Sequence, residues 1–230
     1  MIVRVGIPTL SSEIHIECMK SIMKLEKILK QHKIKMVLDF EVGSLITRCR
    51  QNILKRFYKY KNDYLLFIDA DISNFENHIV DLITKVQKYK TAIIGINYRK
   101  KKYDLVARDY THNNVFNGNL LNNVLNTIYT SKEEVIKVKH IPTGCMLIPR
   151  KIIEKLLLCD NRGTHFNYFD CYVDVDNKYL SEDYAFCNRV RELLTGDILC
   201  YYSPNLKHHL GNIYFDGTYK NYLINLNKNI

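Results

Sequence analysis

The stretch 64-YLLFIDADI-72 decides the fold class of this chain. Its short apolar run is typical of a buried strand, and it ends in two carboxylates, Asp69 and Asp71, separated only by Ala70. Ionised carboxylates at the end of a buried strand are costly unless a cation or hydrogen-bond donors meet them. Two carboxylates and a phosphorylated substrate form the usual cage for Mg²⁺ or Mn²⁺. The stretch favours a metal site, although Asp71 could instead cap a helix and Asp69 pair with a lysine.

The segments on either side of this strand alternate between strand and helix patterns. A strand is expected at residues 2–7, before Pro8, and a helix from Ser11 or Ser12 to about His32. The alternation continues with a strand at 35–40, a basic helix at 45–60, a helix at 74–89 and a strand at 92–97. In the basic helix, the residues expected to face inward are Ile46, Ile53, Leu54 and Phe57. This order predicts an α/β fold with a Rossmann-like, mostly parallel central sheet flanked by helices.

The second half of the chain is less regular. Strand patterns occur at residues 135–138, 144–148 and 198–202, and a helical pattern at 149–158. Ser181 is expected to open a helix to Leu194, with Glu182 and Asp183 where the helix dipole favours acids. Hairpins and loops are expected at 100–130, and loops at 168–178 and 204–217, the last of which carries His208 and His209. Residues from 218 onward form a basic tail.

Composition limits the classes of function. A chain of 230 residues suits a single domain, and 47% hydrophobic residues are enough for a core. A formal charge of +10 would attract polyanions, such as a nucleic acid, an anionic membrane or a nucleotide diphosphate. Abundant Lys, Asn, Ile and Tyr, with no Trp, are also what an AT-rich genome such as that of a large DNA virus would produce. The charge is therefore discounted as evidence for a nucleic-acid partner.

The seven cysteines are scattered, and none forms a CxxC pair. This distribution predicts free, mostly buried thiols in a reducing compartment. A strand begins almost at Met1 without a cleavable signal, and no apolar stretch approaches the ~18 residues needed to span a bilayer. We expect a cytoplasmic protein without a transmembrane segment, in the host cytoplasm if the source is viral.

Four separate segments place polar groups at the ends of expected elements. These are Asp69/Asp71, Thr143-Gly144, Glu182/Asp183 and His208/His209. Each has an ordinary structural explanation: first-turn acids, a β-bulge glycine or surface histidines. Together they supply acid, base and metal-ligand groups around a sheet of the nucleotide-binding type.

Five motifs in this order resemble a known family. The motifs are "LLFIDADI", "GINYRKK", "PTGCMLIPRKIIEKL", "YLSEDYAFCNRV" and "HHLGNIYFDG". They look like the glycosyltransferase-A (GT-A) fold, of a small single-domain type known from bacteria, phages and large DNA viruses. The upstream segment "SLITRCRQNILKRFY" also resembles the family's "RARN" helix, although Gln51 stands where that helix usually has Asn. The resemblance implies one domain over residues 1–230, with a nucleotide-sugar-binding half at 1–100, an acceptor-side half at 101–217 and the basic tail at 218–230.

The resemblance also implies a chemistry. In the family the second Asp of the DxD motif usually binds the cation, here Asp71, while Asp69 contacts ribose or a metal-bound water. A C-terminal histidine that completes the shell matches His209, with His208 as the adjacent alternative, and this makes Mn²⁺ preferable to Mg²⁺. Asp183 matches the general base of inverting members, and Glu182 would orient the acceptor. The expected reaction transfers a sugar from a nucleotide-diphosphate sugar, with UDP as the expected nucleotide, to a hydroxyl of a glycan, glycolipid or protein.

Further residues are expected to hold the donor. Pro8 and Thr9 follow the first strand where the family binds base and ribose, and Ala70 of the DxD motif is also expected at the donor. Arg48, Arg50 and Lys101 can neutralise diphosphate oxygens, although Arg48 could equally lie on a solvated helix face. Gln51 would approach the nucleotide, and the backbone amide of Gly144 is available to a ligand.

Two other functions compete with this interpretation. A sugar-1-phosphate nucleotidyltransferase shares the fold logic but normally has a glycine-rich basic signature after the first strand, which "IPTLSSEIH" lacks. A non-catalytic carbohydrate- or nucleic-acid-binding module would suit the basic charge, but no helix-turn-helix, zinc finger or aromatic RNA-reading signature appears. Because both carboxylates and the histidines are present, catalysis is favoured.

Overall fold

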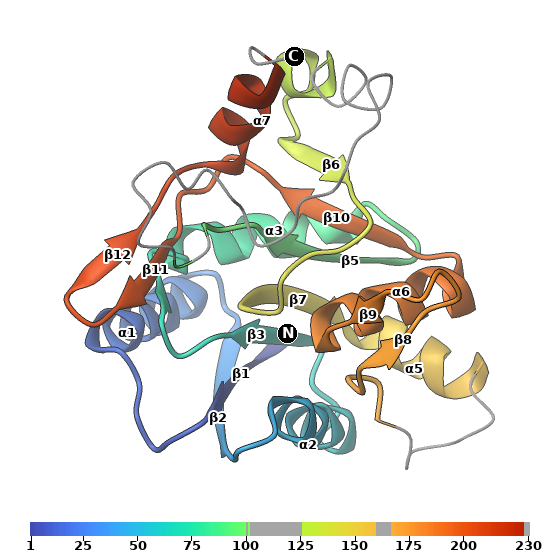
Figure 1. Cartoon of the computed structure of the whole chain (residues 1–230). Helices are drawn as coiled ribbons and strands as arrows, with labels where there is room; N and C mark the ends of the chain where they lie inside the picture. The colour runs from blue at the N-terminus through green and yellow to red at the C-terminus, as the bar shows by residue number, and fades with distance from the viewer. Residues whose placement is uncertain (100, 102–125, 160–166, 228–230) are drawn as a thin grey trace.

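A seven-stranded sheet forms the centre of the molecule in the computed structural model, which describes residues 1–99, 101, 126–159 and 167–227 (Figure 1). Its strand order is β2-β1-β3-β7-β5-β10-β6. The strands are β1 (Ile2–Thr9), β2 (Lys35–Val42), β3 (Tyr64–Ile68), β5 (Ala92–Ile96), β6 (Val135–Lys137), β7 (Cys145–Pro149) and β10 (Asp197–Tyr201). β1 pairs in parallel with β2 and β3, and β5 with β10, whereas β7 is antiparallel to both neighbours and β6 is antiparallel to β10. The predicted mostly parallel α/β sheet is confirmed.

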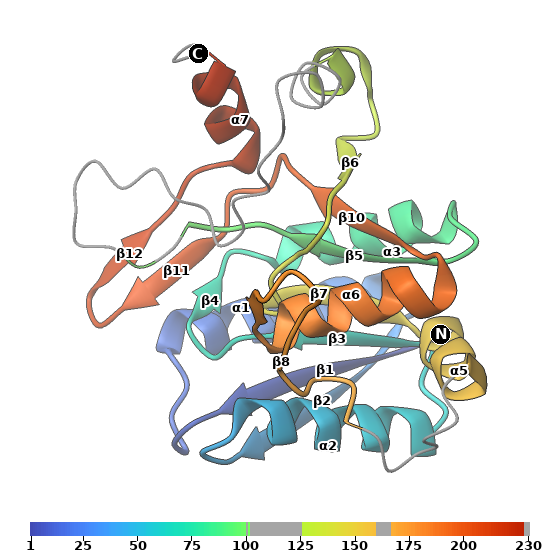
Figure 2. The same ribbon diagram turned by 45° about the vertical axis from the view of Figure 1, so that its right-hand side comes forward.

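Helices cover both faces of this sheet because its central strands are apolar on both sides. Alternate residues of β3 enter different cores: Leu65 and Phe67 pack with α2 (Ile46–Lys59), α5 (Arg150–Cys159) and α6 (Glu182–Leu194), and Leu66 and Ile68 with α1 (Ile16–Gln31) and α3 (Ile79–Gln87). Figure 2 shows α2 and α6 in front of the sheet and α1 behind it. Such period-2 burial on two faces is typical of strands in doubly covered sheets.

A small second sheet brings the C-terminal segment to the end of β3. Its order is β12-β11-β4, with β4 at Ile72–Ser73, β11 at Lys207–Leu210 and β12 at Ile213–Phe215. In this sheet His208 is opposite Ile72, and the amide of His209 donates to the carbonyl of Asp71 at 2.9 Å. The residues at the end of β3 therefore lie against a strand more than a hundred positions away in the chain.

Several expected elements differ from the observed ones. Helix α1 begins at Ile16, not after Ser11 or Ser12, because His15 caps it by accepting the amide of Glu17 at 3.2 Å. Residues 74–89 contain a short 3₁₀ helix, η1 (Glu76–His78), before α3. The side chain of Ile46 is 38% exposed instead of inward-facing, whereas Ile53, Leu54 and Phe57 are buried as predicted.

The C-terminal part is more regular than its composition indicated. The expected loop at 204–217 contains the β11–β12 hairpin, the expected loop at 168–178 contains β8 (Tyr172–Val173), which pairs with β9 (Tyr179–Leu180), and the expected tail contains α7 (Tyr219–Asn227). Tyr219 is 1% exposed, so burial of an aromatic ring anchors α7. Most of the loops and hairpins expected at 100–130 lie outside the described residues.

All seven cysteines are free thiols, and five of them are buried. This agrees with the scattered spacing in the sequence. Among the described helices, none has the length and apolar content needed to cross a bilayer.

Candidate active site

An open cleft of about 830 Å³ lies where β1 and β3 end. It is bounded by the loop after β1, the turn after β3, the start of α6 and the β11–β12 hairpin (Figure 1). Ligand sites in open α/β sheets occur at the carboxyl ends of strands, and this cleft occupies that position. The predicted site residues that line it are Pro8, Thr9, Arg50, Asp69, Ala70, Asp71, Glu182 and His208.

The carboxylate of Asp69 is fixed from two sides. Arg50 donates through Nη2 to Oδ1 at 2.9 Å, and the hydroxyl of Tyr98 donates to Oδ2 at 3.4 Å. The backbone of Asp69 also bonds to β7, because its amide donates to the carbonyl of Gly144 at 3.2 Å. These contacts restrict rotation of the Asp69 carboxylate toward a bound ligand.

Gly144 is required by the close approach of these groups. A Cβ atom at this position would lie 2.0 Å from the hydroxyl oxygen of Tyr98 and 2.8 Å from Oδ2 of Asp69. Tyr98 is only 4% exposed and has no room to retreat. Packing therefore requires glycine here, since any side chain would displace Tyr98 and Asp69, and the predicted contact of its amide with a ligand stays a prediction.

Asp71 is surrounded by basic groups. Lys101 forms an ion pair with Oδ2, and Nε2 of His208 lies 3.6 Å from the same oxygen. Burial alone would raise the pKa of Asp71, but the hydrogen bonds from His208 and Lys101 outweigh it and lower the pKa to about 2. Asp71 is therefore an ionised acceptor at neutral pH, beside a lysine and an imidazole.

His208, not His209, faces Asp71. The two side chains point to opposite sides of β11, as successive residues of a strand do. Nδ1 of His208 is 2.8 Å from the carbonyl of Arg99, and Nε2, at the other edge of the ring, lies 3.6 Å from Oδ2 of Asp71. His209 is buried, its Nε2 lies 2.7 Å from Oγ of Ser73, and its ring faces away from the carboxylate. Of the two histidines predicted from the sequence, the structure therefore brings the alternative, His208, beside Asp71, and His209 beside Ser73.

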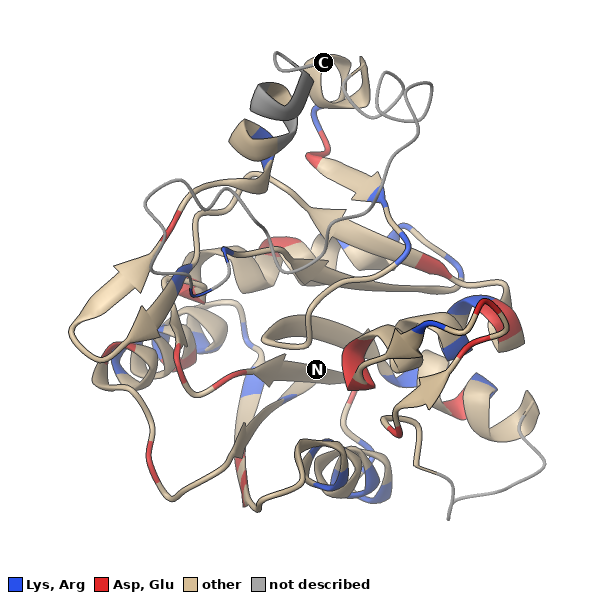
Figure 3. Cartoon of the chain, in the orientation of Figure 1, with Lys and Arg blue, Asp and Glu red and all other residues tan. Residues whose placement is uncertain are grey.

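Arg50 is buried beneath the cleft between carboxylates from two regions of the chain. Its Nη2 is 2.9 Å from Asp69 and 3.7 Å from Glu182, and its side chain is 3% exposed. Figure 3 shows acidic segments at the end of β3 and at the start of α6, with basic residues along α2. The Nε and Nη1 atoms of Arg50 are buried without a hydrogen-bond partner among the described residues. Arg50 thus neutralises the protein's own carboxylates, rather than presenting an open fork to the donor as predicted.

The two acids of α6 have different surroundings. Glu182 lines the cleft, and burial raises its pKa although Arg50 opposes that shift. Asp183 does not line the cleft, and its Oδ1 accepts a hydrogen bond from the hydroxyl of Ser181. Of the two predicted acids, Glu182 borders the open space of the cleft, and Asp183 follows it on the first turn of α6.

Two predicted donor contacts lie elsewhere. Arg48 is exposed on the first turn of α2 and is not part of the cleft lining, which matches the alternative of a solvated helix face. The side chain of Gln51 is buried on the other side of α2, where Oε1 accepts the amide of Tyr168 at 3.1 Å. Gln51 positions the chain's own backbone, so its predicted approach to a nucleotide is not supported.

Comparison with known proteins agrees with this arrangement. The family model described as "Glycosyl transferase family 2" matches residues 48–157, a span that contains Arg50, both aspartates and Gly144. Protein A197 from STIV has a similar structure, with a TM-score of 0.55 and 16% identity over 91% of this chain and 86% of that one. The chain has the GT-A fold, and nearly half of it resembles a glycosyltransferase family.

Other solved structures are more distantly similar to this chain. S. aureus TarS 1–349 has a TM-score of 0.45 and 16% identity, over 94% of this chain and 60% of that one. A glycosyltransferase involved in glycosylation of the major capsid of PBCV-1 has a TM-score of 0.34 and 8% identity, over 67% and 63%. Comparison with curated proteins gives no significant match.

The role of His15 in the cleft was not predicted from the sequence. His15 lines the cleft, stacks on His209 with ring centroids 4.0 Å apart, and contacts the carbonyl of Gly211 through Nε2 at 3.0 Å. It therefore joins the start of α1 to the β11–β12 hairpin. A lone histidine after Ile14 carries no local signal for this role, which depends on a hairpin at the other end of the chain.

Proposed function

We propose that this protein is a glycosyltransferase that takes a nucleotide-diphosphate sugar as donor, with a UDP-sugar first among the candidates, and transfers the sugar to a hydroxyl group. The proposal rests chiefly on the pair Asp69 and Asp71 at the end of β3, one tied to Arg50 and the other facing Lys101 and His208. A diphosphate leaving group needs positive charge, and the Asp71 side of the cleft can supply it.

The nucleoside is proposed to lie against the end of β1. The Oγ1 atom of Thr9 is buried and has no hydrogen-bond partner among the described residues. Because a buried hydroxyl without a partner is unfavourable, a ligand that bonds to it would recover that free energy. Pro8 precedes it in the cleft lining and fixes the backbone angle there.

A divalent cation, Mn²⁺ before Mg²⁺, fits the groups around Asp71. A carboxylate oxygen and the Nε2 atom of an imidazole, 3.6 Å apart, are groups that Mn²⁺ accepts as ligands once the imidazole is neutral. Among the described residues no cluster of three or more such side chains occurs, so the donor's phosphates and water would complete the shell. When bound, the cation would act as a Lewis acid on the leaving diphosphate. Lys101, now paired with Asp71, is placed to pair with a phosphate instead.

The attacking hydroxyl must transfer its proton to a base, and Asp183 is proposed for this role in an inverting reaction. Glu182 shares Arg50 with Asp69, so protonating it would leave the buried guanidinium less well compensated. Glu182 is therefore assigned to orienting the acceptor. Asp183 stands at the start of α6, where the helix dipole favours its ionised form.

The donor and cation assignments are tested by measuring nucleotide release from a panel of nucleotide sugars, with and without Mn²⁺, Mg²⁺ and a chelator. We expect release of UDP that depends on the cation and is abolished in Asp71→Ala. The control is Asp81→Ala, which removes an exposed carboxylate of α3 outside the cleft. Release that is unaffected by chelator and by Asp71→Ala would refute the proposal.

The base assignment is tested by comparing Asp183→Asn with Glu182→Gln. Loss of a general base lowers kcat by about 10²–10⁴-fold, and we expect this of Asp183→Asn. Glu182→Gln should raise KM for the acceptor more than it lowers kcat. If the two effects are reversed, the base is Glu182. Retention of the donor's anomeric configuration in the product, measured by NMR, would contradict inversion.

A further inference from the structure

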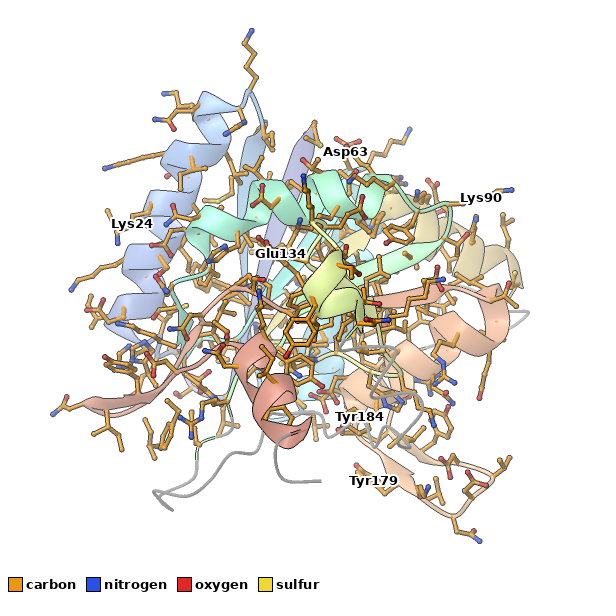
Figure 4. The ribbon with its side chains drawn as sticks, turned by 90° about the horizontal axis from the view of Figure 1, so that it is seen from above. Lys24, Asp63, Lys90, Glu134, Tyr179 and Tyr184 are labelled. Atoms are coloured by element: carbon orange, nitrogen blue, oxygen red, sulfur yellow. The ribbon has the colours of Figure 1, made fainter. Side chains whose placement is uncertain are left out.

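A second cavity, of about 540 Å³, lies on the far side of the α6 N-terminus from the cleft. It is bounded by the β8–β9 hairpin, by α6 and by the segment before β7, and its lining includes Tyr172, Tyr179 and Tyr184. None of the residues given a role above lines it. Figure 4 labels Tyr179 and Tyr184 near each other at one edge of the molecule.

Protein groups fix two of these aromatic rings. The guanidinium of Arg189 lies over the ring of Tyr172, 4.9 Å from its centroid, and Asn188 donates to its hydroxyl at 2.7 Å. Tyr184 stacks on His140 with centroids 4.3 Å apart and planes at 6°. Rings held in this way are preorganised and lose little side-chain entropy when a ligand binds.

Tyr179 differs from these two because it is 69% exposed. Its packing in the hairpin does not account for a large aromatic side chain at that position, since Leu180 beside it supplies the buried contact. Exposed aromatic rings beside a concave surface are typical of binding sites, because one side chain offers both an apolar face and a hydroxyl.

The charges of the cavity exclude several ligand classes. Three carboxylates, Asp174, Asp176 and Glu192, stand among three basic side chains of the lining, so neither sign dominates. A phosphate-rich ligand would require an excess of basic groups, and an acyl chain would require an apolar lining. A neutral polyol suits both the rings and the mixed polar groups, because the C–H face of a pyranose packs on an aromatic ring while its hydroxyls bond to carboxylates and amides.

The cavity is continuous in sequence with the proposed catalytic acids. Leu180 and Tyr184 line it, and the residues between them include Glu182, which lines the cleft. A ligand seated on the tyrosines would therefore extend toward the side from which the acceptor must attack.

From this juxtaposition we propose that the acceptor is an oligosaccharide of at least two units, whose non-reacting sugar stacks in the cavity of Tyr172, Tyr179 and Tyr184. The identification of the partner as an acceptor rests on the proposed function, whereas binding of a saccharide in this cavity does not. It selects a glycan from the three acceptor classes expected from the sequence.

The test is retention of the labelled protein on an array of immobilised bacterial, plant and animal oligosaccharides, without donor or metal. We expect wild type to be retained by at least one glycan and Tyr179→Ala to bind it about tenfold more weakly, the loss expected for one aromatic contact. Tyr129→Ala is the matched control, because Tyr129 is 66% exposed and does not line the cavity. Both variants remove exposed rings and should fold.

Two results would overturn the inference: retention by no glycan, or equal weakening by Tyr179→Ala and Tyr129→Ala. Cation-dependent UDP release measured in parallel separates this failure from that of the proposed function. Normal UDP release without glycan retention refutes the tyrosine site alone. Glycan retention without UDP release supports the site and refutes the donor assignment.

Discussion

Replacing Arg50 by methionine should destabilise the protein, because Arg50 is the buried counter-charge of Asp69 and Glu182. Removing one partner of a buried ion pair typically costs about 3–5 kcal/mol. Two features reduce that figure: Asp69 and Glu182 have side chains 29% and 18% exposed, and two guanidinium nitrogens are already unpartnered among the described residues. We therefore expect a loss of about 2–3 kcal/mol, or about 4–12 °C in Tm for a chain of this length.

The assay is urea unfolding followed by circular dichroism, at about pH 7 and at about pH 5. Burial raises the pKa of Glu182 already in the wild type, and loss of Arg50 raises it further. A carboxyl whose folded pKa exceeds its unfolded value binds more protons when folded, so its contribution to stability falls as the pH rises. The loss caused by Arg50→Met should consequently be larger at the higher pH.

Two comparisons isolate the pairwise effect. Arg48→Met makes the same substitution two residues away on an exposed face and should change stability by less than about 0.5 kcal/mol. In an Asp69→Asn background the cost of Arg50→Met should shrink, because one buried charge has already been removed. A loss below about 1 kcal/mol, or an equal loss in both backgrounds, would refute the reasoning.

Three further predictions address other parts of the molecule. Gly144→Ala should cost about 1–3 kcal/mol in unfolding experiments, because its Cβ would overlap the Tyr98 hydroxyl, and it should weaken donor binding in calorimetry. Thr9→Val should leave the unliganded protein as stable or slightly more stable by Tm, since it removes a buried hydroxyl without a partner, but should raise KM for the donor. Burial lowers the pKa of His78 below its usual 6.5, so stability should fall as the pH drops below about 6.5, and the His78→Gln variant should show a flatter stability–pH curve.

Local patterns predicted those parts of the fold that are set by neighbouring residues. β3 has the predicted bounds, Tyr64–Ile68, because a compact apolar run between polar residues can be buried only as a short strand. The position of β3 in the sheet was not predictable. Strand β7, which follows β5 in the chain, inserts antiparallel between β3 and β5. No local pattern encodes that order, which depends on how helices cover the two faces.

The histidine pair shows why the site was predicted only in part. Read as a loop, residues 204–217 give no rule for the directions of His208 and His209, so the family resemblance decided between them. As strand β11, the same residues must alternate, and pairing of His208 with Ile72 turns one ring toward Asp71 and the other toward Ser73. A shift of one residue in register would exchange their roles.

The burial of Arg50 changes how the two halves of the cleft relate to each other. Asp69 belongs to the proposed donor side and Glu182 to the start of α6 on the proposed acceptor side, and a single guanidinium lies between them. Because both carboxylates draw on the same positive charge, a ligand that neutralises Asp69 leaves more of it for Glu182 and stabilises the ionised form of that acid. Donor binding and the charge state on the acceptor side are thus coupled through α2, without any movement of the backbone.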